Sequence, residues 1–140
     1  MTLDNPGFSP CDALVAAMVA VSASDQTMRT SELVAIQRIV DHTPIFANYD
    51  ADRVRAVSQT VFSLFEVEDG LDAMFGLIRD ALPEPLYETA YALACDVAAA
   101  DGRLNEIEAE LLLEMRHELN IPRLHAAAIE LSAQVRHRVL

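Results

Sequence analysis

Two pairs of acidic residues share one spacing and are candidates for binding a cation. Asp25 precedes Glu32 by seven residues, and Asp101 precedes Glu108 by the same interval. Carboxylate oxygens are the ligands that hard divalent cations such as Ca²⁺ prefer. The shared spacing makes these four carboxylates candidate metal ligands.

The segments around these acids resemble one another. A shift of 76 positions places residues 21–25 over residues 97–101 and Glu32 over Glu108, with apolar residues at matching helical positions. Apolar matches of this kind are common between any two amphipathic helices, so the recurring acids are the informative part. They predict an internal repeat of two helix-turn-helix units.

The two types of acid differ in what they require. Asp25 and Asp101 each follow an apolar helix, whose last carbonyl groups carry partial negative charge, so a bound cation would relieve the conflict. Without a cation, both can act in ordinary turns, and Glu32 and Glu108 can cap the first turn of the next helix. The spacing leaves both interpretations open.

One further pattern suggests an enzyme. Glu114 and His117 form a Glu-x-x-His pattern on a helix, with Glu110 one turn earlier. Carboxylate-bridged di-iron bundles use this spacing, but they need it twice, together with two Glu from facing helices. It occurs once here, so an exposed cluster on an acidic helix is favoured.

Hydrophobic periodicity and breaker residues predict the elements that position these residues. Apolar residues recur at helical spacing throughout, and no stretch alternates long enough to predict a strand. The fifth helix, rich in Ala, should be the central buried one. We predict helices over about residues 10–24, 30–42 or 31–42, 50–62 with Asp50 as the cap, 71–82, 86–100, 105–119 and 124–135.

Composition limits the partners and the compartment. The chain has 140 residues and a formal net charge of -12, so it should repel phosphate backbones and anionic lipid. Its N-terminus lacks the pattern of a signal peptide, and no uncharged run is long enough to span a bilayer. We expect a cytoplasmic protein that neither binds nucleic acid nor inserts in a membrane. Cys11 and Cys95 lie in apolar helical patterns and are expected to be buried free thiols.

The segment from Asp101 to Glu108 resembles the hallmark motif of the TerB-like family of tellurite-resistance proteins. It follows an Ala-rich helix and reads Asp-Gly, an apolar residue two positions later, and then Glu. The earlier segment, from Asp25 to Glu32, is similar but has Gln26 where Gly is usual. Since Gly lets the backbone turn its carbonyls toward an ion, the second segment is expected to be the better site.

The resemblance implies a fold and a function. It implies an all-α, compact bundle of about seven helices with an internal pseudo-two-fold repeat, formed by residues 1–140 as a single TerB-like domain. It also implies a non-enzymatic role in resistance to tellurite and other stresses, with a divalent cation such as calcium as the cofactor. By position, the metal ligands would be Asp25, Glu32, Asp101 and Glu108.

The resemblance implies a partner as well. TerB itself is linked to a membrane protein of the tellurite-resistance system, so a peripheral location at the inner membrane is expected through that partner. Two alternatives stay open: a carboxylate-bridged metal enzyme, and an interaction module without metal. The basic end of the last helix, which contains Arg136, His137 and Arg138, suits its own helix dipole and also offers a contrast to the acidic bulk.

Overall fold

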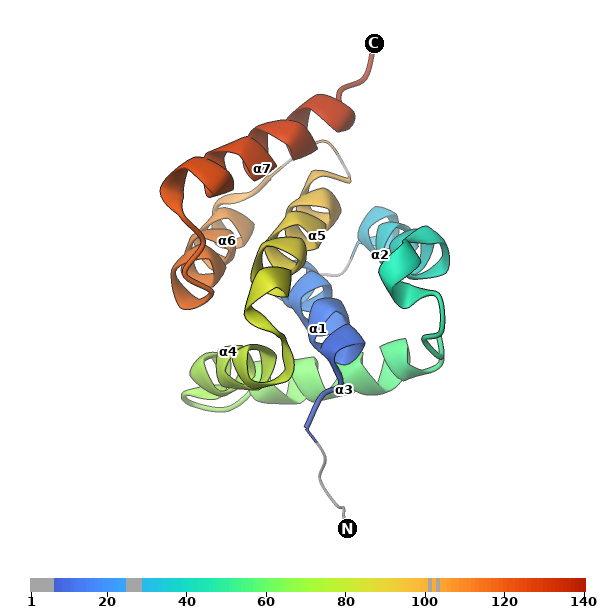
Figure 1. The fold of residues 1–140 in the computed structure, drawn as a ribbon, viewed down its shortest axis with the longest axis vertical. Coiled ribbons are helices and arrows are strands. Elements are labelled where there is room, and N and C mark those ends of the chain that lie inside the picture. The colour runs from blue at the N-terminus through green and yellow to red at the C-terminus, as the bar shows by residue number, and fades with distance from the viewer. Residues whose placement is uncertain (1–6, 25–28, 101, 103) are drawn as a thin grey trace.

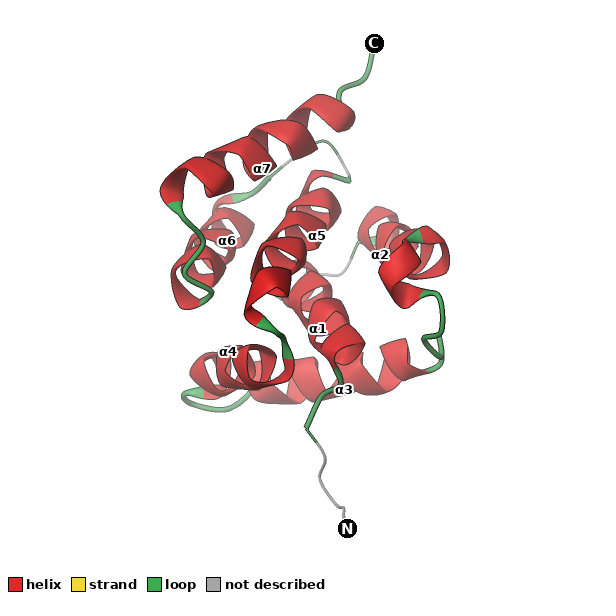
Figure 2. Ribbon diagram, in the orientation of Figure 1, coloured by secondary structure: helices red, strands yellow, loops and turns green. Residues whose placement is uncertain are grey.

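The computed structural model describes residues 7–24, 29–100, 102 and 104–140. These residues form seven α-helices and two short 3₁₀ helices, and no strand occurs among them (Figures 1 and 2). The elements are α1 (Pro10–Ala23), α2 (Thr30–His42), η1 (Pro44–Phe46), α3 (Arg53–Phe65), α4 (Gly70–Ala81), η2 (Glu84–Leu86), α5 (Tyr87–Ala99), α6 (Glu106–Glu118) and α7 (Arg123–Arg136). The predicted all-α bundle of seven helices is confirmed, whereas the pseudo-two-fold repeat stays a prediction.

Helix α1 forms the centre of the bundle. It packs most extensively against α5 and α3, and it also contacts α4, α2 and α6. All its residues from Asp12 to Ala23 are buried, and all of them except Asp12 and Ser22 are apolar. A helix that is apolar on every side is stable only when neighbours cover its whole circumference, and Figure 1 shows α1 in that position.

Helix α5, the predicted central helix, does lie at the centre of the bundle, but it is less completely buried than α1. Helix α5 lies beside α1 and also packs against α7, α6 and α2, but Tyr87, Ala92 and Asp96 on it remain partly exposed. Its Asp96 carboxylate pairs with Arg136 of α7 at 2.8 Å. Because α5 carries ionisable residues on one side, α1 is the more deeply buried of the two.

Helix boundaries agree with the sequence where a strong cap is present. Ser9 caps α1 by accepting a hydrogen bond from the Asp12 backbone N–H, with Pro10 at the first helical position, as expected from their preferences. The third helix differs. Asp50 accepts from the Asp52 backbone N–H at 2.9 Å, and α3 begins only at Arg53. Asp50 thus closes a local turn before the helix rather than capping it.

In Figure 1, α3 and α4 lie at one end of the molecule and α7 lies at the other. The α4 and α6 helices are tied by an ion pair between Arg79 and Glu118. In the described part of the chain, no helix combines the length and apolarity needed to cross a membrane.

Candidate functional site

Two glutamates are fully buried at the starts of α2 and α6. Glu32 and Glu108 each have 0% exposed surface, although ionised glutamates are almost never buried without a partner. Each occupies the third position of its helix, where free backbone N–H groups and the helix dipole favour negative charge. The sequence predicted their place in a first turn but not their burial.

The two helix starts are built differently. Asn105 caps α6, its side-chain oxygen accepting a hydrogen bond from the Glu108 backbone N–H at 2.8 Å. Arg29 precedes α2 and makes no side-chain cap; instead its backbone N–H donates to Glu32 Oε1 at 3.4 Å. The α2 start therefore lacks the side-chain acceptor that stabilises the α6 start.

Arg29 also links the two glutamates through its side chain. Its Nη1 lies 3.6 Å from Glu32 Oε2 and 3.5 Å from Glu108 Oε2. The fold thus brings together two carboxylates that are 76 residues apart in the sequence, with one guanidinium near both. Sequence analysis missed Arg29, whose only local signal is its position three residues before Glu32.

The surroundings of Glu32 disfavour the ionisation of its carboxyl group. The pKa of Glu32 is raised to about 8, mainly by burial and also by the neighbouring Glu108 carboxyl, while Arg29 acts in the opposite direction. Glu32 Oε2 and Glu108 Oε1 have no hydrogen-bond partner within the described part of the chain. Such orphaned buried oxygens are costly, and they are the type of atom that a hard cation takes as a ligand.

The helix ends near these glutamates provide no compensating positive charge of their own. Helix α1 is followed by the segment that leads to α2, and α5 by the segment that leads to α6. Neither α1 nor α5 has a basic residue in its last turn. Gly102, after α5, has a φ of 78°, a conformation that favours glycine. This agrees with the turn predicted at Asp101-Gly102.

The other two predicted ligands cannot be placed. Asp25 and Asp101 lie outside the described residues, as does Gln26. Among the residues that are described, no group of three or more His, Cys, Asp or Glu side chains is arranged to hold a metal ion. The structure therefore brings together half of the predicted set, Glu32 and Glu108, and their role as ligands stays a prediction.

A third buried acid, Asp12, has a full set of partners. Tyr49 donates to its Oδ1 at 2.6 Å, Arg53 donates from Nη2 to its Oδ2 at 2.8 Å, and the Ser9 backbone N–H donates to Oδ2 at 3.0 Å. Although burial opposes them, these bonds hold the pKa of Asp12 below its usual value. This cluster ties α1 to the segment before α3 and leaves no oxygen free for a ligand.

The remaining reactive side chains are poorly placed for chemistry. Burial raises the pKa of the Cys95 thiol to about 12, so Cys95 is an inert buried thiol, as predicted. Cys11 is only half-buried, and its thiol donates to the Ile45 carbonyl at 3.4 Å. Glu114 and His117, the enzyme alternative, both lie on the exposed face of α6.

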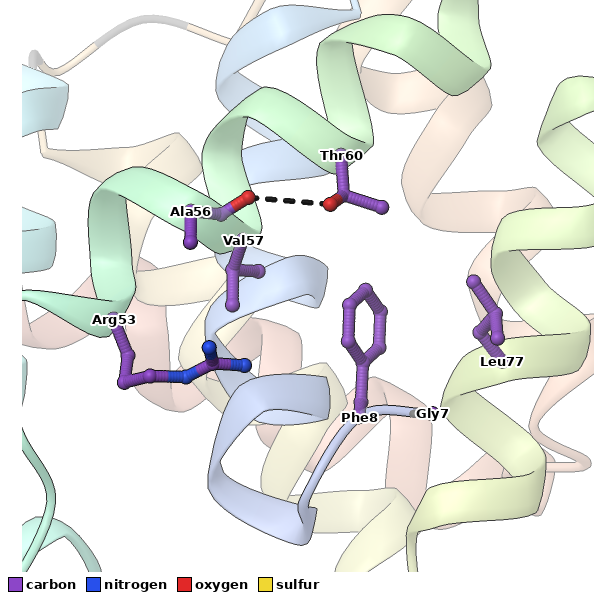
Figure 3. A pocket seen from close by; sticks show the side chains of 7 residues that line it. All are labelled: Gly7, Phe8, Arg53, Ala56, Val57, Thr60 and Leu77. Carbon is purple, nitrogen blue, oxygen red and sulfur yellow. Dashed lines mark hydrogen bonds between the residues drawn. The ribbon is translucent and has the colours of Figure 1, made fainter. Parts of the chain in front are cut away.

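A small hollow between α3 and α4 has the wrong lining for a polar site. Its volume is about 330 Å³, and Figure 3 shows the Phe8 ring between the α3 side chains and Leu77 of α4. The polar groups at its edge are committed elsewhere. Thr60 donates to the Ala56 carbonyl at 3.2 Å, and Arg53 pairs with Asp12.

A larger groove lies between α5 and α7. It has a volume of about 570 Å³ and runs along the C-terminal parts of α5 and α7, reaching Gly102 and Leu104 at the start of the segment before α6. A second hollow of about 400 Å³, beside the first turn of α2, shares Ala100 and His137 with the groove. Exposed Arg38 and Arg138 belong to these two hollows, in a chain whose net charge is -12.

Comparison with known proteins identifies one family. The chain matches the family described as "Tellurite resistance protein TerB" over residues 11–131, which includes all seven helix cores and the four predicted ligands. No curated protein and no solved structure matches the chain.

Proposed function

The chain belongs to the TerB family, and from this premise we propose that it is a non-enzymatic tellurite- and stress-resistance protein that binds a divalent cation. The observation that supports this most is the pair of fully buried glutamates, Glu32 and Glu108, each with a carboxylate oxygen that lacks a hydrogen-bond partner in the described residues. A structural role alone would favour satisfied oxygens, as at Asp12.

The chemistry of this pair suits a hard cation. Two carboxyls in an apolar interior are costly when both are ionised, and the raised pKa of Glu32 reflects that cost. A divalent cation supplies the charge that both need, and it accepts carboxylate oxygens and carbonyl oxygens together. Asp25 and Asp101, which precede the glutamates by seven residues, are the proposed remaining ligands, with calcium as the first cation to test.

Calorimetry on the full chain with calcium, magnesium and zinc tests the proposal. We expect binding by the wild type and its loss in Glu32→Gln and Glu108→Gln, and also in Asp101→Asn, a change that an ordinary turn would tolerate. The matched control is Glu114→Gln, an exposed acid on α6 that should bind like the wild type. No heat from any of the three cations at millimolar concentration would overturn the proposal.

We further propose that the groove along α5 and α7, together with the adjoining hollow at α2, binds an acidic segment of a partner protein. We also place the chain in the cytoplasm next to a membrane partner of the tellurite-resistance system. Charge complementarity supports an acidic occupant. Arg38 and Arg138 have no ion pair within the described part of the chain and border an apolar surface that includes Val34 and Leu104, each about half exposed. Acidic segments would find few other basic surfaces on a chain with this net charge.

Affinity capture from a cell extract tests the docking surface, with the captured protein identified by mass spectrometry. We expect the double variant Arg38→Glu/Arg138→Glu to lose the partner that the wild type retains. The matched control is Arg55→Glu, an exposed arginine on α3, outside the groove. Repeating the capture with a chelator separates docking that needs the cation from docking that does not, and equal capture by all variants would contradict the proposed surface.

A further inference from the structure

Arg29 places a guanidinium where the proposed cation is needed. Its Nη1 lies within 3.6 Å of Glu32 Oε2 and within 3.5 Å of Glu108 Oε2. In the described part of the chain, it is the basic side chain that forms ion pairs with these two glutamates. A single positive group near both carboxylates offsets part of their charge when no metal is bound.

We propose that the Arg29 guanidinium competes with the divalent cation for the two glutamates. The cation displaces the guanidinium when it binds, and Arg29 thereby lowers the affinity of the site for the cation. This inference rests on the proposed cation site and concerns how that site is regulated. Two positive groups cannot share the same pair of buried oxygens without strong repulsion. The guanidinium and the cation therefore occupy the carboxylates alternately.

The distances between Arg29 and the two glutamates favour contacts that a binding cation can break. Arg53 pairs with Asp12 through two nitrogens, with one bond of 2.8 Å and another of 3.3 Å. Arg29 approaches its glutamates through one nitrogen at 3.5–3.6 Å, beyond the usual length of a charge-assisted hydrogen bond. A pair of this length loses less when it separates.

The position of Arg29 also permits it to move. Its side chain is 32% exposed, whereas Glu32 and Glu108 are completely buried. It precedes α2 and provides no side-chain cap for that helix. The guanidinium therefore already reaches solvent at the edge of the buried pair, where an entering cation can displace it from the two glutamates.

The start of α6 has a neutral residue at the position that corresponds to Arg29 at the start of α2. Asn105 is 76 residues after Arg29, and it caps α6 through the Glu108 backbone N–H. Asn is among the best residues at such a position. Replacing Arg29 by Asn would make the start of α2 like the start of α6. It would remove the competing charge and provide a favourable cap.

Calcium titration of the full-length chain by calorimetry tests this role. We expect Arg29→Asn to bind calcium about tenfold more tightly than the wild type, a change of one decade in Kd, and Arg29→Lys to stay close to the wild type because it retains the charge. The matched control is Arg38→Asn, an exposed arginine on α2. It makes the same change in net charge away from the glutamates.

A second readout follows the guanidinium itself. In NMR spectra, the Nε–H signal of Arg29 should shift on calcium addition by more than that of Arg53, whose ion pair with Asp12 is unaffected. Thermal unfolding in the absence of metal establishes that each variant is folded before titration. An arginine that stays on the glutamates would keep its Nε–H proton in slow exchange with water after calcium is added, whereas a displaced one would exchange faster.

The outcomes separate the two ideas. If the wild type binds calcium but Arg29→Asn binds it equally or more weakly, Arg29 is not a competitor, and the cation site itself stands. If Arg38→Asn gains as much affinity as Arg29→Asn, net charge explains the effect and the inference is wrong. If neither the wild type nor Arg29→Asn binds calcium, magnesium or zinc, the proposed cation site fails and the inference with it.

Discussion

Asp12 and the Glu32–Glu108 pair are both buried acids, but their surroundings differ. Asp12 accepts hydrogen bonds from a backbone N–H, a tyrosine hydroxyl and an arginine, and its pKa is lowered. Within the described residues, the glutamates pair with Arg29 at 3.5–3.6 Å and each keeps an oxygen without a hydrogen-bond partner, and the pKa of Glu32 is raised. Burial alone does not identify a functional acid; the informative feature is whether the protein satisfies it.

The largest expected effect comes from removing the charge of the satisfied acid. Asp12→Asn should lower the free energy of unfolding by about 2–3 kcal/mol, because it weakens several charge-assisted hydrogen bonds at once. The loss stays moderate because Arg53, about half exposed, can return to water. Urea denaturation measures it, and Asp80→Asn, an exposed acid on α4, is the control. A change as small as that of the control would contradict the structural role of Asp12.

Replacing a carboxylate by an amide in the Glu32–Glu108 pair should change the free energy of unfolding in the opposite direction. Glu32→Gln should raise the free energy of unfolding of the metal-free protein at pH 8 or above by about 1–2 kcal/mol, because a neutral amide relieves the buried charge and can donate to Glu108. Urea denaturation in the presence of a chelator measures this gain. If Glu32→Gln destabilises the protein as Asp12→Asn does, the two acids have similar structural roles and the contrast fails.

The contrast also predicts two different dependences on pH. The pKa of Glu32 is raised in the folded protein from 4.5 to about 8, so the metal-free protein should lose stability as pH rises between these values, because the unfolded chain releases the proton first. Asp12, whose pKa is lowered from 3.8, acts in the other direction, and its contribution is lost on acidification below that value. Denaturation from about pH 5 to pH 8 should show a smaller decline in Glu32→Gln than in the wild type, and equal slopes would contradict this prediction.

The smallest expected effect concerns the two helix starts. Asn105→Ala removes the side-chain cap of α6 and should lower the free energy of unfolding by about 1 kcal/mol. Arg29→Ala removes no side-chain cap from α2, so its effect in the metal-free protein should be mainly electrostatic and depend on salt. Denaturation at low and high salt distinguishes them. A salt-dependent loss in Asn105→Ala would show that the two starts are more alike than the structure indicates.

Local sequence predicted the parts of the site that depend on neighbours in the chain. The first-turn positions of Glu32 and Glu108 followed from helical periodicity and capping preferences, as did Asn105 at the α6 start. The burial of those side chains could not be predicted, because a first-turn glutamate is usually solvated. Neither could the role of Arg29, whose contact with Glu108 spans 79 residues.

The amino-acid sequence by itself determined the helices, most of their boundaries, the acidic character of the surface and the family motif, because these depend on residues within a few positions of one another. Only the tertiary structure decided which acids are satisfied. Asp12 meets Tyr49 and Arg53 from 37 and 41 residues away, whereas Glu32 and Glu108 meet in the interior with too few donors among the residues that the structure describes. That difference depends on how the helices pack, and packing determines which charged groups share a low-dielectric interior.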